Sequence, residues 1–303
     1  MDLNEAKDFV VWVKKSDGCA SLTVRDYEYQ FGSFVKWAEQ QGISTLEEVT
    51  PKVIRSYLKE GEQKGNAART INIRIRYLKA AFNILIEEGF IKQNPVQSIK
   101  LKKEPLDTVQ PLSDEVVEKL LAQPDRRTFV GRRNYVCMLV SLDTGIRPKE
   151  LFGLSEGDFH ETHIIVPPEV AKDRERRFLP LGESVIKELK RYLLLKKGWG
   201  GDILFPSQDG GRLKTSSWGD TLEKYAKQAG IEDVRVTPYS FRHTFAVNFL
   251  RNGGDVFTLQ KILGHTTLEM TRIYVQLSEL DVKMVHNEVS PAEKFIRIKR
   301  RRR

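Results

Sequence analysis

The sequence predicts a mainly α-helical protein that carries one small antiparallel β-sheet and is divided into two domains. Apolar residues recur at the spacing of helices through most of the 303 residues. Two short β-like runs, "THIIVPPEV" and "RRFLPL", flank the very polar turn "AKDRER". A segment with prolines, lysines and little periodicity separates the two parts, and we interpret residues 95–110 as a basic linker with a domain boundary near residue 108.

Residues 1–94 are expected to form a bundle of four helices. The first two are amphipathic, and Gly42 stops the second. The third begins with Thr50 as its N-cap and Pro51 at its first helical position, and the fourth is a long helix that ends at Gly89. The fourth helix is predicted to face the core through Ile71, Ile75, Leu78, Phe82 and Leu85.

A polar stripe follows a neighbouring face of this fourth helix and contains no acidic residue before Glu87. A solvated helix surface is one interpretation of such a stripe. Contact with DNA is the other, because arginine and asparagine side chains match guanine and adenine edges in a major groove. The candidate DNA-binding residues are Arg69, Asn72, Arg76, Lys79 and Asn83.

Residues 111–290 are expected to form a second, mostly helical domain. Ser113 caps its first helix, and a buried helix that breaks at Gly145 is followed by another that begins at Pro148. The last residues, 291–303, form a basic tail, which is either a solvated end or a contact to DNA phosphates. Beyond the two strands, helices are predicted over residues 183–197, 216–229, 241–252, 255–263 and 267–276.

The composition narrows the class of partner. The chain carries 50 lysines and arginines against 41 acidic residues, a net charge of +9 with a pI near 9.4. A basic excess of this size favours a polyanionic partner, most often nucleic acid. Cys19 and Cys137 form neither a disulfide framework nor a zinc pattern. We find no signal peptide and no run of about 18 apolar residues, and we expect a cytoplasmic protein without membrane contact.

Polar residues in four segments of the second domain do not fit a core. Each has an ordinary structural explanation when taken alone, such as a surface charge, a turn lysine or a half-buried aromatic. The segments are "TGIRPKEL", "VAKDRERRFLPL", "TPYSFRHTFA" and "ILGHTTLEMTRIYVQL". Their candidate residues are Arg147, Lys172, Arg242, His243, His265 and Tyr274.

Together the four segments resemble the conserved boxes of the tyrosine recombinases, the phage-integrase-type family. "TGIRPKEL" is similar to the family's first box, and Lys172 followed by "RFLPL" is similar to its second. "PYSFRHTF" and "ILGHTTLEMTRIY" are similar to the third and fourth. The order and spacing also fit. The resemblance implies a SAM-like helical core-binding domain followed by a tyrosine-recombinase catalytic domain, as in the simple two-domain, Xer-like members.

The resemblance also implies a role for each residue. Arg147 and Arg242 clamp the non-bridging oxygens of a DNA phosphate, for which planar, bidentate donors are suited. Tyr274 is the nucleophile that forms a 3′-phosphotyrosine. Lys172 is the general acid that protonates the leaving 5′ oxygen. His265 adds a hydrogen bond to the phosphate.

Three further residues lie beside these. Glu150 follows Arg147 by one helical turn and is expected to hold the geometry of the site rather than react. His243 is expected to brace the site from behind Arg242. Tyr239 departs from the family, which usually has histidine there; a phenol can donate a hydrogen bond to a phosphate, but its pKa does not suit proton shuttling at neutral pH.

No cofactor or metal is expected, because the arginines supply the charge that a metal would bring and the phosphotyrosine conserves the energy of the broken bond. The sequence "HETH", His160 to His163, lacks a metal-binding spacing. The expected partner is double-stranded DNA with inverted-repeat half-sites, with no small-molecule substrate. The resemblance implies a homotetramer on two duplexes. An apolar stripe beyond Tyr274 then docks into a neighbouring protomer, unless it packs on its own domain; its members are Leu280, Met284, Val285 and Val289.

The function that follows is site-specific DNA recombination through a 3′-phosphotyrosine and a Holliday junction. A type IB topoisomerase and a DNA-binding protein without catalysis are the alternatives. Within the recombinases, an Xer-like enzyme that resolves chromosome dimers and a mobile-element integrase or resolvase active in transposition both remain open.

Overall fold

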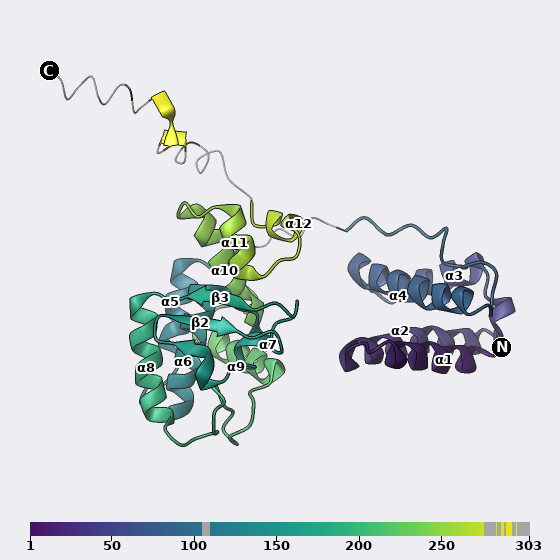
Figure 1. The fold of residues 1–303 in the computed structure, drawn as a ribbon. Helices are drawn as coiled ribbons and strands as arrows, with labels where there is room; N and C mark the ends of the chain where they lie inside the picture. Colours follow the sequence, from purple (N-terminus) through teal and green to yellow (C-terminus); the bar gives the residue numbers. More distant parts are fainter. Residues whose placement is uncertain (105–109, 276–282, 284–285, 288, 293–294, 296–303) are drawn as a thin grey trace. The chain divides into compact units, whose positions relative to one another are not determined.

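The computed structural model describes residues 1–104 and 110–275, together with residues 283, 286–287, 289–292 and 295 (Figure 1). The chain divides into two compact units, Met1–Asp107 and Thr108–Arg303, and each is considered by itself. The predicted apolar stripe at Leu280, Met284 and Val285, and most of the basic tail, lie outside the described residues.

The N-terminal unit is a bundle of four helices, as predicted. Thr50 caps the third helix by accepting a hydrogen bond from the backbone nitrogen of Val53, and Pro51 occupies the first helical position. Gly42 and Gly89 follow helix ends with positive φ angles, which a residue without a Cβ adopts most easily. The helices are α1 (Leu3–Ser16), α2 (Ser21–Gln40), α3 (Pro51–Gln63) and α4 (Ala68–Glu87), with a 3₁₀ turn at Leu46–Glu48.

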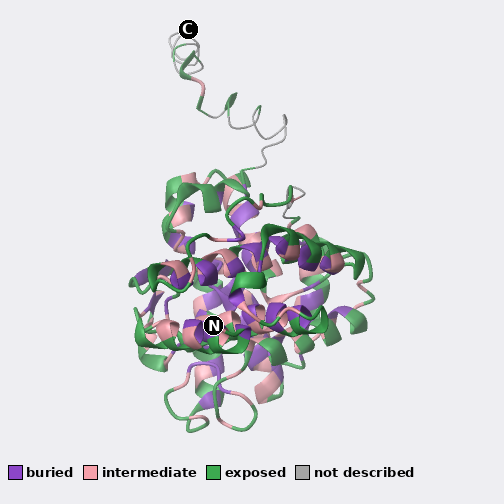
Figure 2. Cartoon of the chain, turned by 90° about the vertical axis from the view of Figure 1, so that its right-hand side faces the viewer, coloured by how far each residue is buried: buried purple, intermediate pink, exposed green. Residues whose placement is uncertain are grey.

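The core of this unit forms between the helices, and Figure 2 shows buried and exposed residues alternating along them. Phe31 and Phe34 of α2 pack edge-on against Phe82 of α4. The predicted core face of α4 is confirmed, since all five of its members are buried: Ile71, Ile75, Leu78, Phe82 and Leu85. Apolar burial along one face of each amphipathic helix therefore holds the bundle together.

The structure corrects two predictions about the end of this unit. Asn72 was assigned to an exposed polar stripe, but its side chain is 1% exposed. Its amide donates to the backbone oxygen of Lys102 and accepts from that residue's backbone nitrogen. Residues 95–104 were assigned to the linker, yet Val96 is buried in the bundle core. The chain therefore folds back along α4 before it leaves the unit, and this return covers Asn72.

The second unit contains a three-stranded antiparallel sheet of order β1-β2-β3 and eight α-helices among its described residues. Ile164 of β2 pairs with Leu179 of β3, and both are buried. The strands are β1 (Phe159–His160), β2 (His163–Val166) and β3 (Arg177–Pro180). The helices are α5 (Asp114–Ala122), α6 (Phe129–Thr144), α7 (Pro148–Leu151), α8 (Glu183–Lys196), α9 (Thr215–Gln228), α10 (Pro238–Arg251), α11 (Val256–Leu263) and α12 (Leu268–Arg272), with a 3₁₀ turn at Glu156–Asp158.

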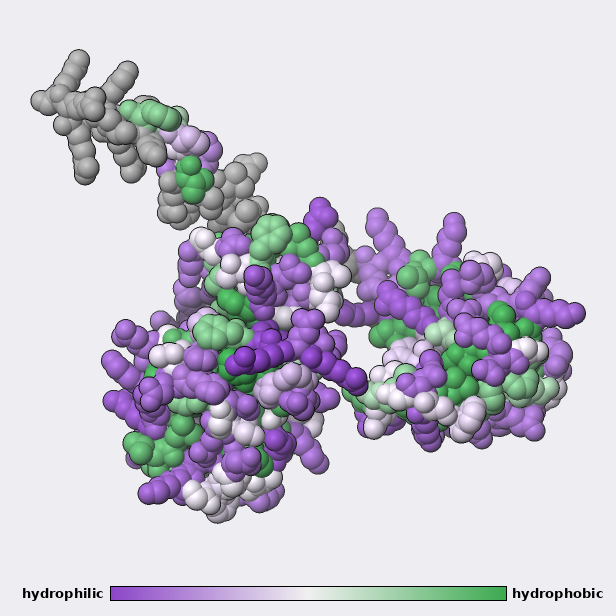
Figure 3. Space-filling view, in the orientation of Figure 1, coloured by the Kyte–Doolittle hydropathy of each residue, from purple (hydrophilic) through white to green (hydrophobic). Residues whose placement is uncertain are grey.

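The predicted elements of this unit are present, with differences at their ends. The two-residue strand β1 was not predicted. Helix α10 begins at Pro238 rather than at residue 241, because Thr237 and Ser240 cap it and proline favours the first turn. Helix α12 ends at Arg272, which leaves Tyr274 just beyond the helix. Hydrophilic side chains cover much of the visible surface of both units (Figure 3). Among the described helices, none is long and apolar enough to span a membrane.

Candidate active site

The candidate site begins where the buried helix α6 ends. Gly145 closes α6 with a φ of 60°, and a Cβ there would lie 2.4 Å from Cδ1 of Phe245. Only glycine fits this turn, which directs the chain into α7 and buries Arg147 at its N-cap. Arg147 donates from Nη1 to Glu150 Oε1 at 2.8 Å and from Nη2 to the backbone oxygen of Gly264. The local turn therefore places Arg147 at the start of α7, and Glu150 and the distant Gly264 orient its guanidinium.

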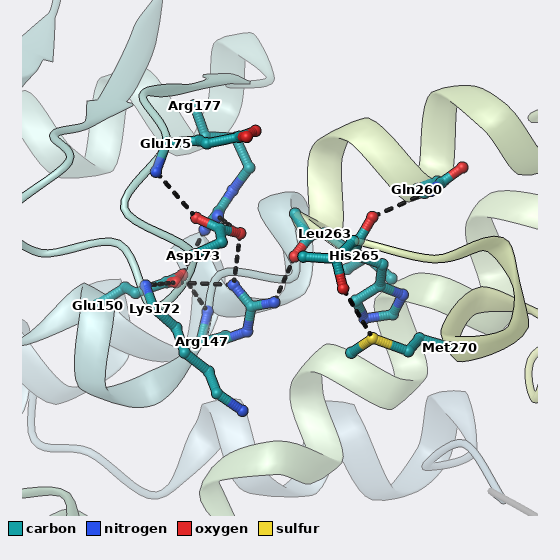
Figure 4. Close-up of polar contacts among 12 residues, drawn as sticks. Arg147, Glu150, Lys172, Asp173, Glu175, Arg177, Gln260, Leu263, His265 and Met270 are labelled. Carbon is teal, nitrogen blue, oxygen red and sulfur yellow. Dashed lines mark hydrogen bonds and ion pairs between the residues drawn. The ribbon is translucent and has the colours of Figure 1, made fainter. Parts of the chain in front are cut away.

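Glu150 contacts the start of α7, the turn at Lys172 and strand β3. Its side chain is 1% exposed. Beyond Arg147, it accepts from the guanidinium of Arg177 on β3 and from the backbone nitrogen of Lys172 at 3.2 Å. Asp173 also lies 3.6 Å from the Arg147 guanidinium (Figure 4). Glu150 thus contacts both guanidiniums and the turn that carries Lys172, and its positioning role stays a prediction.

Arg242 is the fifth residue of α10 and is buried. Its guanidinium donates to the backbone oxygens of Gly145 at 2.7 Å and Leu263 at 2.9 Å, and lies 2.8 Å from Nε2 of His265. Burial, reinforced by the nearby Arg147 cation, lowers the pKa of Arg242 to about 10. The side chain therefore remains a cation at neutral pH, held in a fixed orientation.

His265 directly follows Gly264, the left-handed C-cap of α11. Its Nδ1 lies 2.9 Å from Oγ1 of Thr271 on α12, and its Nε2 faces Arg242. Burial, together with the Arg242 and Arg147 cations, lowers the pKa of His265 to about 4. At neutral pH this imidazole is uncharged, and both of its nitrogens have partners.

Tyr274 is a buried phenol at the centre of the cluster. Its oxygen lies 3.0 Å from Nδ1 of His243, and its ring stacks on that of His265 with the centroids 6.2 Å apart. Burial raises the pKa of Tyr274, while Arg242 and Arg147 act in the opposite direction. The phenol is therefore protonated at neutral pH and must lose its proton before it can attack. His243, expected behind Arg242, lies instead against this candidate nucleophile.

Lys172 and Tyr239 lie at the exposed edge of the site. The backbone of Lys172 contacts Glu150, and its side chain extends past Arg147 with the amine directed away from the carboxylates (Figure 4). Tyr239 is 46% exposed and lies one helical turn before His243, with the two rings 6.4 Å apart. The structure thus brings together Arg147, Glu150, Arg242, His243, His265 and Tyr274, and it leaves the side chains of Lys172 and Tyr239 open to solvent.

Sequence reasoning missed Arg177, Asp173 and Thr271 as members of the site. Arg177 is buried, and among the described residues its Nε and Nη1 have no hydrogen-bond partner. Alternation along β3 could have identified it, because Arg177 shares the inward face with Leu179. Asp173 and Thr271 carry no comparable signal, since each acts through a contact with a distant segment.

The charges of the cluster favour an anion. Three guanidinium groups, from Arg147, Arg177 and Arg242, are set against the carboxylates of Glu150 and Asp173, which leaves one net positive charge around a neutral His265. Within the described residues, no group of three or more histidine, cysteine, aspartate or glutamate side chains could hold a metal ion. A cavity of about 690 Å³ borders the cluster at Arg177 and His265. Such an arrangement suits an oxyanion such as phosphate.

The candidate DNA-binding residues of α4 form a separate set in the N-terminal unit. Arg69, Arg76 and Asn83 are exposed, and Lys79 is half-buried. Arg76 lies 3.9 Å from Glu104, and Asn83 accepts a hydrogen bond from Asn94 at 2.6 Å. Asn72 is the one member whose side chain the structure buries. The other four present a basic, polar surface to solvent.

Comparisons with known proteins cover nearly the whole chain. Residues 110–280 match the model of the phage integrase family, and residues 6–89 match that of the phage integrase N-terminal SAM-like domain. A tyrosine recombinase XerD of Listeria monocytogenes is 28% identical over 292 residues, which cover 94% of this chain and 98% of that protein. A tyrosine recombinase XerC of Thermodesulfovibrio yellowstonii is 30% identical over 298 residues, which cover 95% of this chain and 96% of that protein.

Solved structures give the same result for the fold. The crystal structure of XerA recombinase is 26% identical, with a TM-score of 0.53 over 95% of this chain and 99% of that one. A lambda integrase dimer bound to a COC′ core site is 20% identical, with a TM-score of 0.73 over 89% of this chain and 97% of that one. With its two family domains in this order and its cluster of arginines, histidines and a buried tyrosine, the chain belongs to the phage integrase family of tyrosine recombinases, the enzymes that cleave and rejoin DNA.

Proposed function

We propose that this chain is a site-specific DNA recombinase that forms a 3′-phosphotyrosine on Tyr274. The observation that carries the proposal is the convergence of two buried arginines on one phenol. Arg147 and Arg242 come from segments 95 residues apart in the numbering, yet both contact the Leu263–Gly264 turn that precedes His265. Tyr274 is buried beside the same histidine.

The arginines stabilise the charge that develops on the phosphate. Each guanidinium has five N–H groups. Arg147 and Arg242 use only some of them to donate to Glu150 and to backbone oxygens. The remaining donors can bind the non-bridging oxygens of a DNA phosphate. Because the guanidiniums are held before the substrate arrives, little reorganisation is needed in the transition state. The guanidiniums thereby supply the positive charge, and the proposed chemistry uses no metal or other cofactor.

The bond changes are a pair of reversible transesterifications. The oxygen of Tyr274 attacks the phosphorus, and the bond to the 5′ oxygen breaks. Lys172, on an exposed turn at the edge of the site, gives a proton to that leaving oxygen. The phosphotyrosine keeps the energy of the broken bond, so a 5′-hydroxyl from another strand can attack it and rejoin the DNA without ATP.

The DNA partner and the assembly follow from the same reaction. Exchange between two duplexes requires four cleavable strands, which favours a homotetramer on paired sites made of inverted-repeat half-sites. One solved relative, 19% identical with a TM-score of 0.71, is a lambda integrase tetramer bound to a Holliday junction. The exposed basic residues of α4, Arg69 and Arg76, are suited to hold the duplex. An Xer-like subclass is favoured, because XerD and XerC proteins match along 94–95% of the chain.

Covalent capture tests this function. Wild type and Tyr274→Phe are incubated with a pool of nicked duplexes of randomised sequence, and DNA attached to denatured protein is recovered and sequenced. Wild type is expected to attach a restricted set of sequences through the 3′ end, and Tyr274→Phe none, although it still binds the selected duplexes. Adducts that persist in Tyr274→Phe contradict the proposal. Relaxation of plasmids that lack the selected sequence identifies a type IB topoisomerase instead.

A further inference from the structure

The structure also bears on how Tyr274 loses its proton. The phenol is buried and its pKa is raised, so attack at neutral pH needs a base within hydrogen-bonding distance. Among the described residues, two imidazoles contact the Tyr274 ring, those of His243 and His265. The two imidazoles differ in which part of Tyr274 they meet: His243 lies against the phenolic oxygen, and His265 stacks on the ring.

His265 is unsuited to the task. Its Nε2 faces an N–H donor of Arg242 at 2.8 Å, and its Nδ1 lies 2.9 Å from the hydroxyl of Thr271. It stacks on the Tyr274 ring instead of meeting its oxygen. Three nearby guanidiniums oppose its protonation, and its pKa is lowered to about 4. An imidazole in this position is a poor acceptor of a proton near neutral pH.

Tyr239 cannot supply a base either. It lies one helical turn before His243 on α10, and its side chain is a half-exposed phenol. A phenol that still carries its proton can accept a hydrogen bond but does not take up a second proton. Lys172 lies at the edge of the site, and its side-chain nitrogen is directed away from the carboxylates. An ammonium group has donors but no lone pair, so it accepts no proton.

We propose that His243 is the catalytic general base that takes the phenolic proton of Tyr274 on Nδ1. Nδ1 lies 3.0 Å from the phenolic oxygen, and the contact joins α10 to a residue 31 positions later in the chain. A neutral His243 with its proton on Nε2 presents the Nδ1 lone pair to this oxygen. The inference rests on the proposed function, because it assigns a role in cleavage by Tyr274.

Each proton that leaves one group during cleavage is taken up by another. As the bond from the Tyr274 oxygen to phosphorus forms, the phenolic proton moves to His243, which becomes an imidazolium. The bond from phosphorus to the 5′ oxygen breaks, and the ammonium of Lys172 protonates that oxygen. In rejoining, the attacking 5′-hydroxyl returns its proton to Lys172, and the His243 imidazolium returns its proton to the departing phenol. His243 is therefore needed in both directions.

The first test is the rate of cleavage by His243→Gln. Single-turnover formation of the covalent adduct is measured on a nicked duplex that traps cleavage. The variant is expected to react roughly 10²-fold more slowly than wild type, the lower part of the range for general bases. Binding of the duplex and the melting temperature should stay near wild type. His160→Gln, the same change at an exposed histidine of β1, is the matched control and should react at the wild-type rate.

The second test separates a base from a residue that only positions Tyr274. Replacing Tyr274 by 3,5-difluorotyrosine lowers the pKa of the nucleophile, so less help from a base is needed. In this background the defect of His243→Gln should shrink by about tenfold or more, as expected when the barrier to proton removal falls. A substrate with a 5′-bridging sulfur, whose leaving group needs no proton, should rescue Lys172→Ala and leave the His243→Gln defect in place.

Three outcomes overturn the proposal. Cleavage by His243→Gln within threefold of wild type means that another group takes the proton. An unchanged defect with the fluorinated tyrosine assigns His243 to positioning alone. Rescue by the bridging sulfur places His243 on the leaving-group side. Each outcome presupposes a wild-type adduct that Tyr274→Phe abolishes; failure to form any such adduct contradicts the proposed function rather than the role of His243.

Discussion

The arginines proposed to act on DNA lie in opposite environments in the two units. Arg147 and Arg242 in the catalytic unit are buried, and backbone oxygens or Glu150 hold each guanidinium in place. Arg76 in the N-terminal unit has a side chain that is 60% exposed, with one distant ion pair to Glu104. Buried cations are desolvated and oriented by the fold before DNA arrives, whereas exposed cations are hydrated and screened by salt. The first kind suits catalysis, and the second suits binding of many phosphates.

Arg242→Ala is expected to have the largest effect, on cleavage. Loss of one preorganised donor costs roughly 10²–10³-fold in the rate of the chemical step. Binding should weaken far less, because many other cations contact the duplex. Single-turnover adduct formation and a binding titration on the same duplex measure the two effects. Cleavage within a few-fold of wild type contradicts the assignment of Arg242 to the phosphate clamp.

Glu150→Gln should destabilise the catalytic unit. The change removes the buried carboxylate that pairs with Arg147 and Arg177, and leaving buried cations unpaired costs about 3 kcal/mol or more in the free energy of unfolding. Thermal or urea unfolding measures it. Glu115→Gln removes half of an exposed i,i+4 pair on α5 and should cost less than about 1 kcal/mol. If the two variants lose the same free energy of unfolding, buried ion pairs do not contribute more to stability than exposed ones in this protein.

His265 should make stability depend on pH. Its pKa in the folded protein, about 4, lies below the ordinary value of about 6.5 expected after unfolding. Between these values the unfolded chain binds more protons, so the contribution of His265 is present above pH 6.5 and is lost as the pH falls toward 4. The melting temperatures of wild type and His265→Asn, compared from pH 7.5 to 4.5, should converge toward acid. A constant difference shows that His265 does not titrate in this way.

Arg76→Ala should have the smallest effect, and on binding alone. Each phosphate contact that is lost reduces the slope of log K against log salt concentration by about 1. The rate of adduct formation at saturating protein should not change. Lys64→Ala is the control, because this exposed lysine follows the end of α3 and pairs with Glu60; it should leave the slope unchanged. A reduced rate of adduct formation at saturating protein would show that Arg76 also affects the chemical step.

The sequence by itself determined the elements and the reactive residue types. Caps and glycines at Thr50, Ser113 and Gly145 act through neighbours within four residues, so local spacing predicts the helices that they start or end. The four boxes likewise identified Arg147, Arg242, His265 and Tyr274, which the structure gathers in one site. The bounds of α10 and α12 differ from the prediction, because Thr237 and Ser240 cap α10 earlier and α12 ends at Arg272.

Only the tertiary structure decided which partner each polar side chain meets. Asn72 fits an exposed stripe by periodicity, yet the returning chain at Lys102 buries it. Arg177 joins Glu150 across 27 positions, and His243 meets Tyr274 across 31. Helical periodicity constrains residues a few positions apart, whereas these contacts depend on how helices and strands pack. The same packing gives this recombinase its buried charges and places a histidine against the proposed nucleophile, Tyr274.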